Sequence, residues 1–105
     1  MDMPENWLVA LRAWAAEHQS IRELWLFGSR ADGRSTPDSD VDLAIALTNL
    51  DWAFGTYMAK GDDWQNELKT IVGRDVDLQP ILPGTKEDEK VRRTGCLLWS
   101  RSTAE

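Results

Sequence analysis

The spacing of apolar residues along the chain predicts alternating helices and strands. Between residues 4 and 18, apolar side chains recur every three or four positions, which is typical of a helix with one face on a core. Residues 21–27 end in a continuous apolar run, and residues 40–47 alternate strictly between large apolar residues and acidic or small ones. Both segments are therefore predicted to be strands, with the first in the middle of a sheet.

The second half of the chain continues this alternation. Residues 51–72 carry an apolar helical face and are expected to form a helix that is interrupted near Gly61. Residues 74–82 predict a strand, residues 85–94 a short charged helix and residues 95–99 a last strand. The order of elements therefore predicts an α+β fold: a small mixed β-sheet with helices packed on one face.

Composition sets limits on function. The chain has 105 residues, and residues 1–105 are expected to form a single domain. Its 12 Lys and Arg against 18 Asp and Glu give a net charge of −6, which disfavours direct binding of nucleic acid. The single cysteine, Cys96, favours a cytoplasmic location, and no apolar run is long enough to cross a membrane. Chemistry on phosphates would therefore need positive charge from a metal cation.

Two aspartates on the alternating segment carry a first chemical signal. Asp40 and Asp42 lie at positions i and i+2 of the predicted strand, so their side chains are expected on the same side. Asp77 lies on another predicted strand and can join them if the two strands are neighbours. Three carboxylates around two Mg²⁺ ions form the arrangement used for in-line nucleotidyl transfer. Alternatively, the pair is simply a solvated strand end, since Asp-x-Asp is common on strands.

A segment rich in turn-forming residues follows the first strand. Gly28 would let the backbone approach a phosphate closely, and the Ser29 hydroxyl could donate a hydrogen bond to a phosphate oxygen. Arg30 adds a planar cation. Residues 28–39 are therefore expected to be a loop, with room for one helical turn, that could cradle a triphosphate. Taken alone, Gly-Ser at a strand end is also an ordinary turn.

These motifs together resemble those of a known family. Residues 28–43, GSRADGRSTPDSDVDL, closely resemble the signature of minimal nucleotidyltransferases of the DNA polymerase β-like superfamily. The resemblance extends over nearly the whole chain, including RDVDL at residues 74–78 and GCLL at residues 95–98. It implies the palm-like nucleotidyltransferase fold of that superfamily.

The resemblance implies how ATP would be bound as a substrate. Ser29 would contact the nucleotide phosphates, helped by the backbone of Gly28 and by the Arg30 side chain. Family members often have a basic residue where this chain has Asp32, whereas Arg34 is basic instead. This departure puts the affinity for the nucleotide in question.

The resemblance also implies a catalytic role for each carboxylate. Asp40 and Asp42 would hold two Mg²⁺ ions, and Asp77 would bind the catalytic ion and help to activate the acceptor hydroxyl. That hydroxyl would attack the α-phosphate of ATP, and pyrophosphate would leave. Asp75 is a weaker candidate, because the family places the acid between two apolar residues, as at position 77.

The expected acceptor is another protein. Larger family members carry an extra domain for their acceptor, and a chain of this length is not expected to. Small members of this kind resemble antitoxins of bacterial toxin–antitoxin pairs, which transfer AMP from ATP to a tyrosine of a HEPN-domain ribonuclease toxin. The acidic charge fits a basic partner surface. Trp52, Phe54, Tyr57 and Trp99 are candidate contacts with this toxin, and burial in the core is an equally good interpretation.

Two other functions stay open on the sequence alone. The first is a non-catalytic module that neutralises its partner by docking, which the departure at Asp32 would favour. The second is a small-molecule nucleotidyltransferase of the aminoglycoside-modifying kind. It would need an acceptor cleft that a chain of this length could build only as a dimer.

Overall fold

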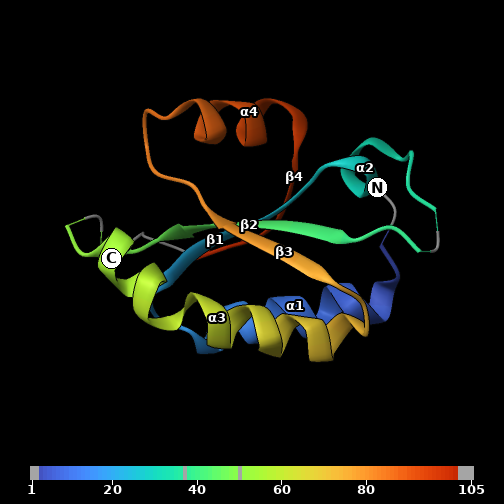
Figure 1. Cartoon of the computed structure of the whole chain (residues 1–105), viewed down its shortest axis with the longest axis horizontal. Helices are drawn as coiled ribbons and strands as arrows, with labels where there is room; N and C mark the ends of the chain where they lie inside the picture. The colour runs from blue at the N-terminus through green and yellow to red at the C-terminus, as the bar shows by residue number, and fades with distance from the viewer. Residues whose placement is uncertain (1–2, 37, 50, 102–105) are drawn as a thin grey trace.

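A four-stranded mixed β-sheet forms the centre of the molecule (Figure 1). The computed structural model describes residues 3–36, 38–49 and 51–101. The strands are Ile21–Phe27 (β1), Val41–Leu47 (β2), Val76–Pro80 (β3) and Cys96–Ser100 (β4). They lie in the order β3-β2-β1-β4. β1 is antiparallel to both of its neighbours, whereas β2 and β3 are parallel.

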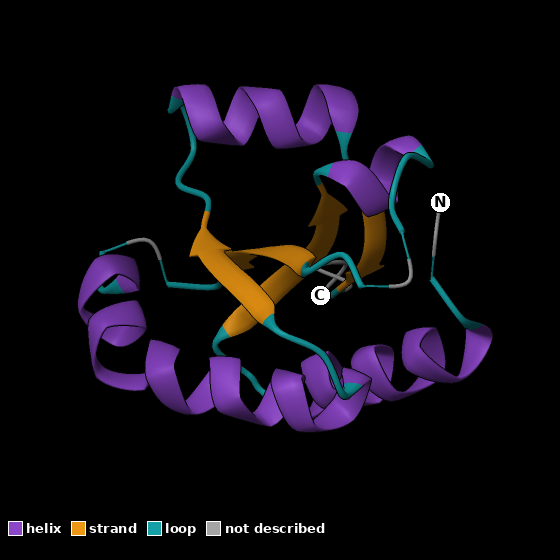
Figure 2. Ribbon diagram, turned by 45° about the vertical axis from the view of Figure 1, so that its right-hand side comes forward, coloured by secondary structure: helices purple, strands orange, loops and turns teal. Residues whose placement is uncertain are grey.

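Two long helices, α1 (Glu5–Glu17) and α3 (Ala53–Val72), cover one face of the sheet (Figures 1 and 2). The main core lies between these helices and the strands, and it includes Leu11 and Leu68 from the helices and Leu43 from β2. Large apolar residues alternate along β2, so one face of this strand contributes its side chains to the core. The α+β fold and the mixed sheet are therefore confirmed. No helix among the described residues is both long and apolar enough to span a membrane.

The helix α4 (Lys86–Thr94) lies on the opposite face of the sheet, which corrects the prediction that helices pack on one face only (Figure 1). Its side chain Val91 packs in a second, smaller core with Trp25, Ala44 and Ala46. The two alanines are small, so the helix can approach the sheet closely. The sequence of α4, KEDEKVRRT, contains one apolar residue, and it therefore has no apolar stripe from which its packing could be predicted.

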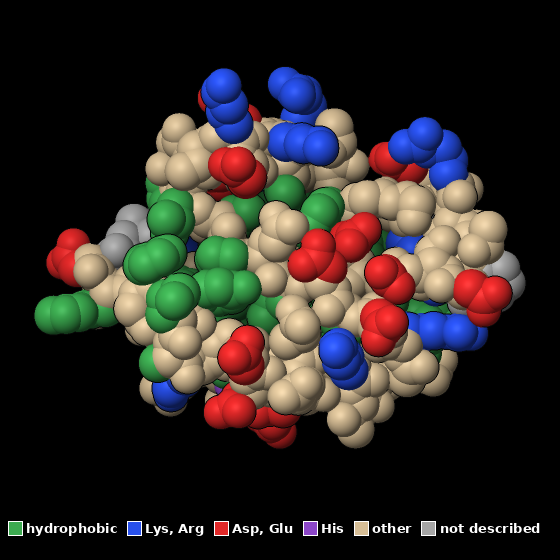
Figure 3. Space-filling model, viewed as in Figure 1, with side chains coloured by type: hydrophobic (Ala, Val, Ile, Leu, Met, Phe, Trp, Pro, Cys, Tyr) green, Lys and Arg blue, Asp and Glu red, His purple; other side chains and the backbone are tan. Residues whose placement is uncertain are grey.

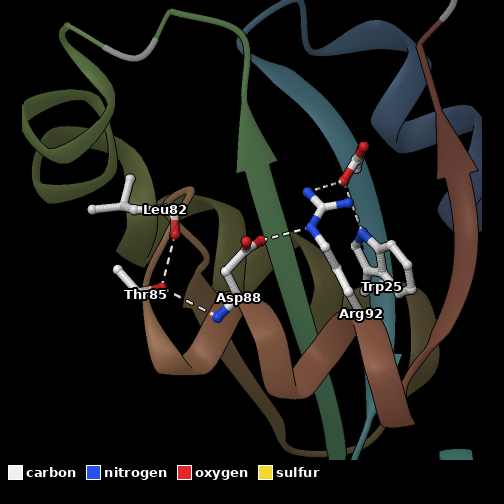
Figure 4. Close-up of polar contacts among 6 residues, drawn as sticks. Trp25, Leu82, Thr85, Asp88 and Arg92 are labelled. Carbon is white, nitrogen blue, oxygen red and sulfur yellow. Dashed lines mark hydrogen bonds and ion pairs between the residues drawn. The ribbon is translucent and has the colours of Figure 1, made fainter.

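Polar contacts complete the attachment of α4 (Figure 4). Thr85 caps the helix, because its hydroxyl accepts a hydrogen bond of 3.2 Å from the Asp88 N–H. Arg92 Nε donates to Asp88 Oδ1 at 2.7 Å, and Arg92 Nη2 donates to Glu23 Oε1 at 2.8 Å. The Trp25 indole N–H donates to the same oxygen at 3.0 Å. One edge of α4 is thus fixed to β1.

Helix α3 runs without interruption through Gly61, so the predicted break at this residue is wrong. The glycine is buried, and a Cβ added to it would lie 3.1 Å from Cε1 of Tyr57. Tyr57 in turn donates a hydrogen bond of 2.8 Å from its hydroxyl to the Leu78 carbonyl oxygen of β3. The glycine therefore gives the tyrosine ring room against the helix and does not end it.

The turn after β1 depends on a glycine for two reasons. Gly28 has φ 75° and ψ −155°, a backbone conformation that residues with a Cβ rarely adopt. A Cβ at this position would also overlap the Oδ2 atom of Asp42 on β2. The single-turn helix α2 (Ser29–Asp32) begins directly after this glycine, as the sequence allowed. The turn and the Asp42 carboxylate are therefore in direct contact.

This contact predicts that Gly28→Ala lowers the free energy of unfolding by ~2–4 kcal/mol, from backbone strain and from overlap with Asp42. Gly33→Ala is the matched control, because Gly33 also has a positive φ, 77°, but has nothing within 4 Å of a Cβ. Its expected loss is about 1 kcal/mol. Urea denaturation measures both. In an Asp42→Ala background the loss from Gly28→Ala should shrink, and an unchanged loss would contradict the proposed overlap.

Candidate active site

Asp42 and Asp77 form an acidic pair on neighbouring strands. Strands β2 and β3 are adjacent, and Asp42 is the register partner of Asp77 in their parallel pairing. Asp42 alternates with Val41 and Leu43, which are buried in the main core, so the pair lies on the other face, where α4 also packs. The strands of Asp42 and Asp77 are therefore neighbours, which is the condition under which Asp77 was expected to join the other carboxylates.

Electrostatic repulsion acts within this group of carboxylates. Partial burial raises the pKa of Asp42 above its ordinary value, and the negative charges of Asp77 and Asp40 raise it further. Asp42 is half-buried, whereas Asp40 and Asp77 are exposed. A cation between these side chains would remove the repulsion, which is the condition that a divalent-metal site satisfies.

The third predicted carboxylate, Asp40, lies just before β2 and lines a hollow that the acidic pair does not line. It lines a shallow hollow of about 410 Å³ together with Asp75, Arg74 and Lys69, which we call the Asp40 hollow. Within residues 3–36, 38–49 and 51–101, no three acidic, histidine or cysteine side chains lie close enough together to hold a metal ion. The oxygen donors fit Mg²⁺ in kind, and a bound ion would have to draw Asp40 toward the acidic pair.

Ser29 lines a second hollow of about 340 Å³, the Ser29 hollow, between the turn after β1 and helix α4. Its lining residues are Phe27, Gly28, Ser29, Asp32, Arg34, Lys90, Val91 and Thr94. Gly28 borders this hollow and also contacts Asp42, so the predicted phosphate cradle lies next to the acidic pair. The contribution of α4 to this hollow was not predicted from the sequence. Lys90 and Thr94 share an edge of that helix, but nothing in the sequence signals which way the edge faces.

Arg30, the third residue of the predicted cradle, lies inside the protein. It is 6% exposed and is not among the residues that line the Ser29 hollow. Its Nη2 atom donates a hydrogen bond of 2.8 Å to the Ser39 carbonyl oxygen, and its guanidinium stands 5.2 Å from the centre of the Trp7 ring. Arg30 therefore ties α2 to the loop before β2 and to α1. Asp32, the acid at the position where family members often have a basic residue, accepts a hydrogen bond of 2.6 Å from Arg34.

The aromatic side chains proposed as partner contacts divide into two groups. Trp52 and Phe54 are 69% and 64% exposed, and Met58 beside them is 67% exposed. We call these three residues the apolar patch. Tyr57 and Trp99 are partly buried and pack against the main core instead. Figure 3 shows hydrophobic side chains gathered on the side of the molecule where α3 begins, next to a group of acidic side chains.

The apolar patch and the acidic pair are linked through Tyr57. Burial raises the pKa of the Tyr57 hydroxyl, and the negative charges of Asp77 and Asp62 raise it further. Tyr57 lies on α3 in the same helical turn as Phe54 and Met58, and its hydroxyl bonds to the backbone of β3. Tyr57 therefore connects the helical turn of Phe54 and Met58 with the strand that carries Asp77.

Comparison with known proteins places the chain in a family. The model of the polymerase beta nucleotidyltransferase family matches residues 10–104. None of the curated proteins matches the chain significantly in sequence. A crystal structure of a toxin–antitoxin with AMP-PNP is similar, with a TM-score of 0.66, 21% identity, and coverage of 95% of this chain and 76% of that chain.

The crystal structure of the toxin–antitoxin MntA-HepT has a TM-score of 0.59 and 18% identity, and the match covers 91% of this chain and 71% of that chain. At these identities the likeness shows a shared fold. The palm-like fold inferred from the sequence motifs is thus confirmed, and the family model covers nearly the whole chain. The chain belongs to the polymerase beta nucleotidyltransferase family.

Proposed function

We propose that this chain transfers AMP from ATP to a tyrosine hydroxyl of a HEPN-domain ribonuclease toxin and acts as the antitoxin of that toxin. The observation that carries the proposal is the contact of the Gly28 turn with Asp42, whose register partner is Asp77. This contact supports the proposal, because it brings the turn proposed to bind phosphates directly beside two carboxylates. Nucleotidyl transfer needs both elements at one place, because the reacting phosphorus lies between them.

The nucleotide is proposed to lie along the turn after β1. The Ser29 hydroxyl donates a hydrogen bond to a phosphate oxygen, and Gly28, without a side chain, lets the phosphates approach the backbone. The Arg30 guanidinium acts through the loop before β2, because its contact with Ser39 holds that loop against α2. Its buried positive charge belongs to the residue directly after Ser29 and adds to the attraction of this segment for an anion.

Two Mg²⁺ ions are the proposed metal cofactor, held by Asp40, Asp42 and Asp77. When bound, they would neutralise the charge of the phosphates and orient them. Asp77 is the more exposed member of the acidic pair, so an acceptor hydroxyl can reach it. Asp77 takes the proton of that hydroxyl, the hydroxyl oxygen bonds to the α-phosphorus, and the bond to pyrophosphate breaks.

A protein acceptor is supported by the surface around the site. The apolar patch exposes large side chains at the start of α3, and such side chains are common anchors in protein interfaces. Asp62 and Asp63 are exposed acids that follow the patch along α3, so a complementary surface would carry both apolar and basic side chains. The similar solved structures are toxin–antitoxin complexes, which agrees with such a partner.

The proposed metal site predicts how stability depends on Mg²⁺ and pH. The raised pKa of Asp42 means that the folded chain binds this proton more tightly than the unfolded chain does. The ionised carboxylate therefore destabilises the metal-free fold, and this loss grows as the pH rises from the unfolded-state pKa through the raised folded-state pKa. Asp42→Asn should raise the Tm of the metal-free protein at pH 7, and this gain should vanish below about pH 4.

Mg²⁺ with ATP should raise the Tm of the wild type and leave that of Asp42→Asn nearly unchanged. Asp63→Asn, which removes an exposed charge on α3, is the matched control and should respond like the wild type. Differential scanning fluorimetry measures all three proteins. Equal responses of the wild type and Asp42→Asn would argue against metal binding at the acidic pair.

AMP transfer itself can be measured on the product of the neighbouring reading frame, if that product is a HEPN-domain protein. Incubation with ATP and Mg²⁺ should add mass in units of AMP to a tyrosine of that partner. Asp42→Asn should reduce the rate by at least ~100-fold, because the phosphates lose their charge stabilisation. If this variant neutralises the ribonuclease as well as the wild type does, the chain acts by docking alone.

The apolar patch should contribute to binding of that partner. Trp52→Ser should weaken the affinity by roughly tenfold or more, because a large exposed aromatic side chain is a common anchor. Its Tm and its affinity for ATP should be unchanged. Val9→Ser is the control, since Val9 is 59% exposed on α1, away from the patch. Isothermal titration with the partner compares them, and equal losses would exclude the patch as the docking surface.

A further inference from the structure

The Ser29 hollow has two walls, and the proposed reaction uses only one of them. The first wall is the turn after β1, and the second is the edge of α4 that carries Lys90 and Thr94. At about 340 Å³ the hollow is at the lower end of the range for ligand pockets, which begins at roughly 300 Å³. Its size therefore suits one part of a nucleotide, such as its phosphate tail, better than a whole nucleotide.

The orientation of α4 is fixed from its other edge. Asp88 and Arg92 are four residues apart and are bonded to each other (Figure 4), and Arg92 also donates a hydrogen bond to Glu23 of β1. Lys90 and Thr94 are also four residues apart, and they occupy the edge that faces the turn. The contacts that hold Arg92 thus direct Lys90 toward the hollow.

Lys90 supplies the uncompensated charge of this hollow. The lining residues include the acid Asp32 and the bases Arg34 and Lys90. Arg34 is paired with Asp32 at 2.6 Å, so their charges offset each other. The ammonium of Lys90 forms no ion pair with any other residue that the structure describes. A hollow with a serine hydroxyl on one wall and a lysine ammonium on the other attracts an anion.

The position of the hollow indicates which anion it would take. For transfer of AMP, the α-phosphate of the nucleotide must lie at the acidic pair. Gly28 contacts Asp42 on one side and borders the hollow on the other. The phosphates beyond the α-phosphate would then extend across Gly28 and Ser29 into the hollow, toward α4.

We propose that Lys90 binds the β- and γ-phosphates of the nucleoside triphosphate from the α4 side, opposite Ser29. This inference rests on the proposed function, because it takes the α-phosphate to lie at Asp42. It assigns α4, a helix outside the sequence motif, to nucleotide binding. It also explains how a chain with Asp32 beside Arg34 keeps a positive charge near the phosphates.

The test compares the affinities of ATP, ADP and AMP for four proteins in the presence of Mg²⁺. Lys90→Ala should weaken ATP binding by about tenfold, ADP binding by less, and AMP binding not at all. Lys90→Arg should recover most of the ATP affinity, since it keeps the charge. Lys86→Ala is the matched control, because Lys86 is exposed on the first turn of α4 and does not line the hollow.

Isothermal titration calorimetry gives these affinities, and an unchanged Tm shows that each variant folds. The inference is overturned if Lys90→Ala binds ATP as the wild type does, if it loses affinity equally for AMP, or if Lys86→Ala loses as much. A wild type that binds no ATP overturns it too. A wild type that binds ATP but transfers no AMP contradicts the proposed function alone, and the comparison of affinities still decides the role of Lys90.

Discussion

The parallel pairing of β2 with β3 is the constraint on which the site depends. Its register sets Asp42 beside Asp77, and a shift by one residue would send one of these side chains into the main core. The register is held by Val41, Leu43 and Leu78, which are buried among the two long helices. The apolar face of these strands therefore determines the position of the charges on the other face.

The strands and their faces could be predicted because alternation and burial are directly coupled in a sheet. Positions 41, 43 and 45 are apolar for the same reason that Asp42 lies on the opposite side. That Asp77 would be its neighbour depended on strand order, which no local pattern contains. Arg30 shows a further limit: it is buried by contacts with Trp7 and Ser39, and a charged residue in a turn-rich segment carries no signal of burial.

The two faces of the sheet are packed differently: one face carries the main core, and the other carries the proposed reaction site. The face covered by α1 and α3 is filled with large apolar side chains. On the other face, Ala44 and Ala46 leave space, and the acidic pair and the turn at Gly28 occupy the end of the strands. Helix α4 could not be assigned to this face from its sequence, because its polar contacts with Glu23 join residues distant in the chain.

Helix α4 is attached by one buried valine and by ionic contacts, whereas α1 and α3 are held by a continuous core. Contacts of this kind weaken as salt screens them, so α4 is the layer in which we expect the earliest local unfolding. Its amide hydrogens would then exchange with solvent well before those of β1 and β2. The wall of the Ser29 hollow could thus open and close on its own, while the sheet holds the carboxylates in place.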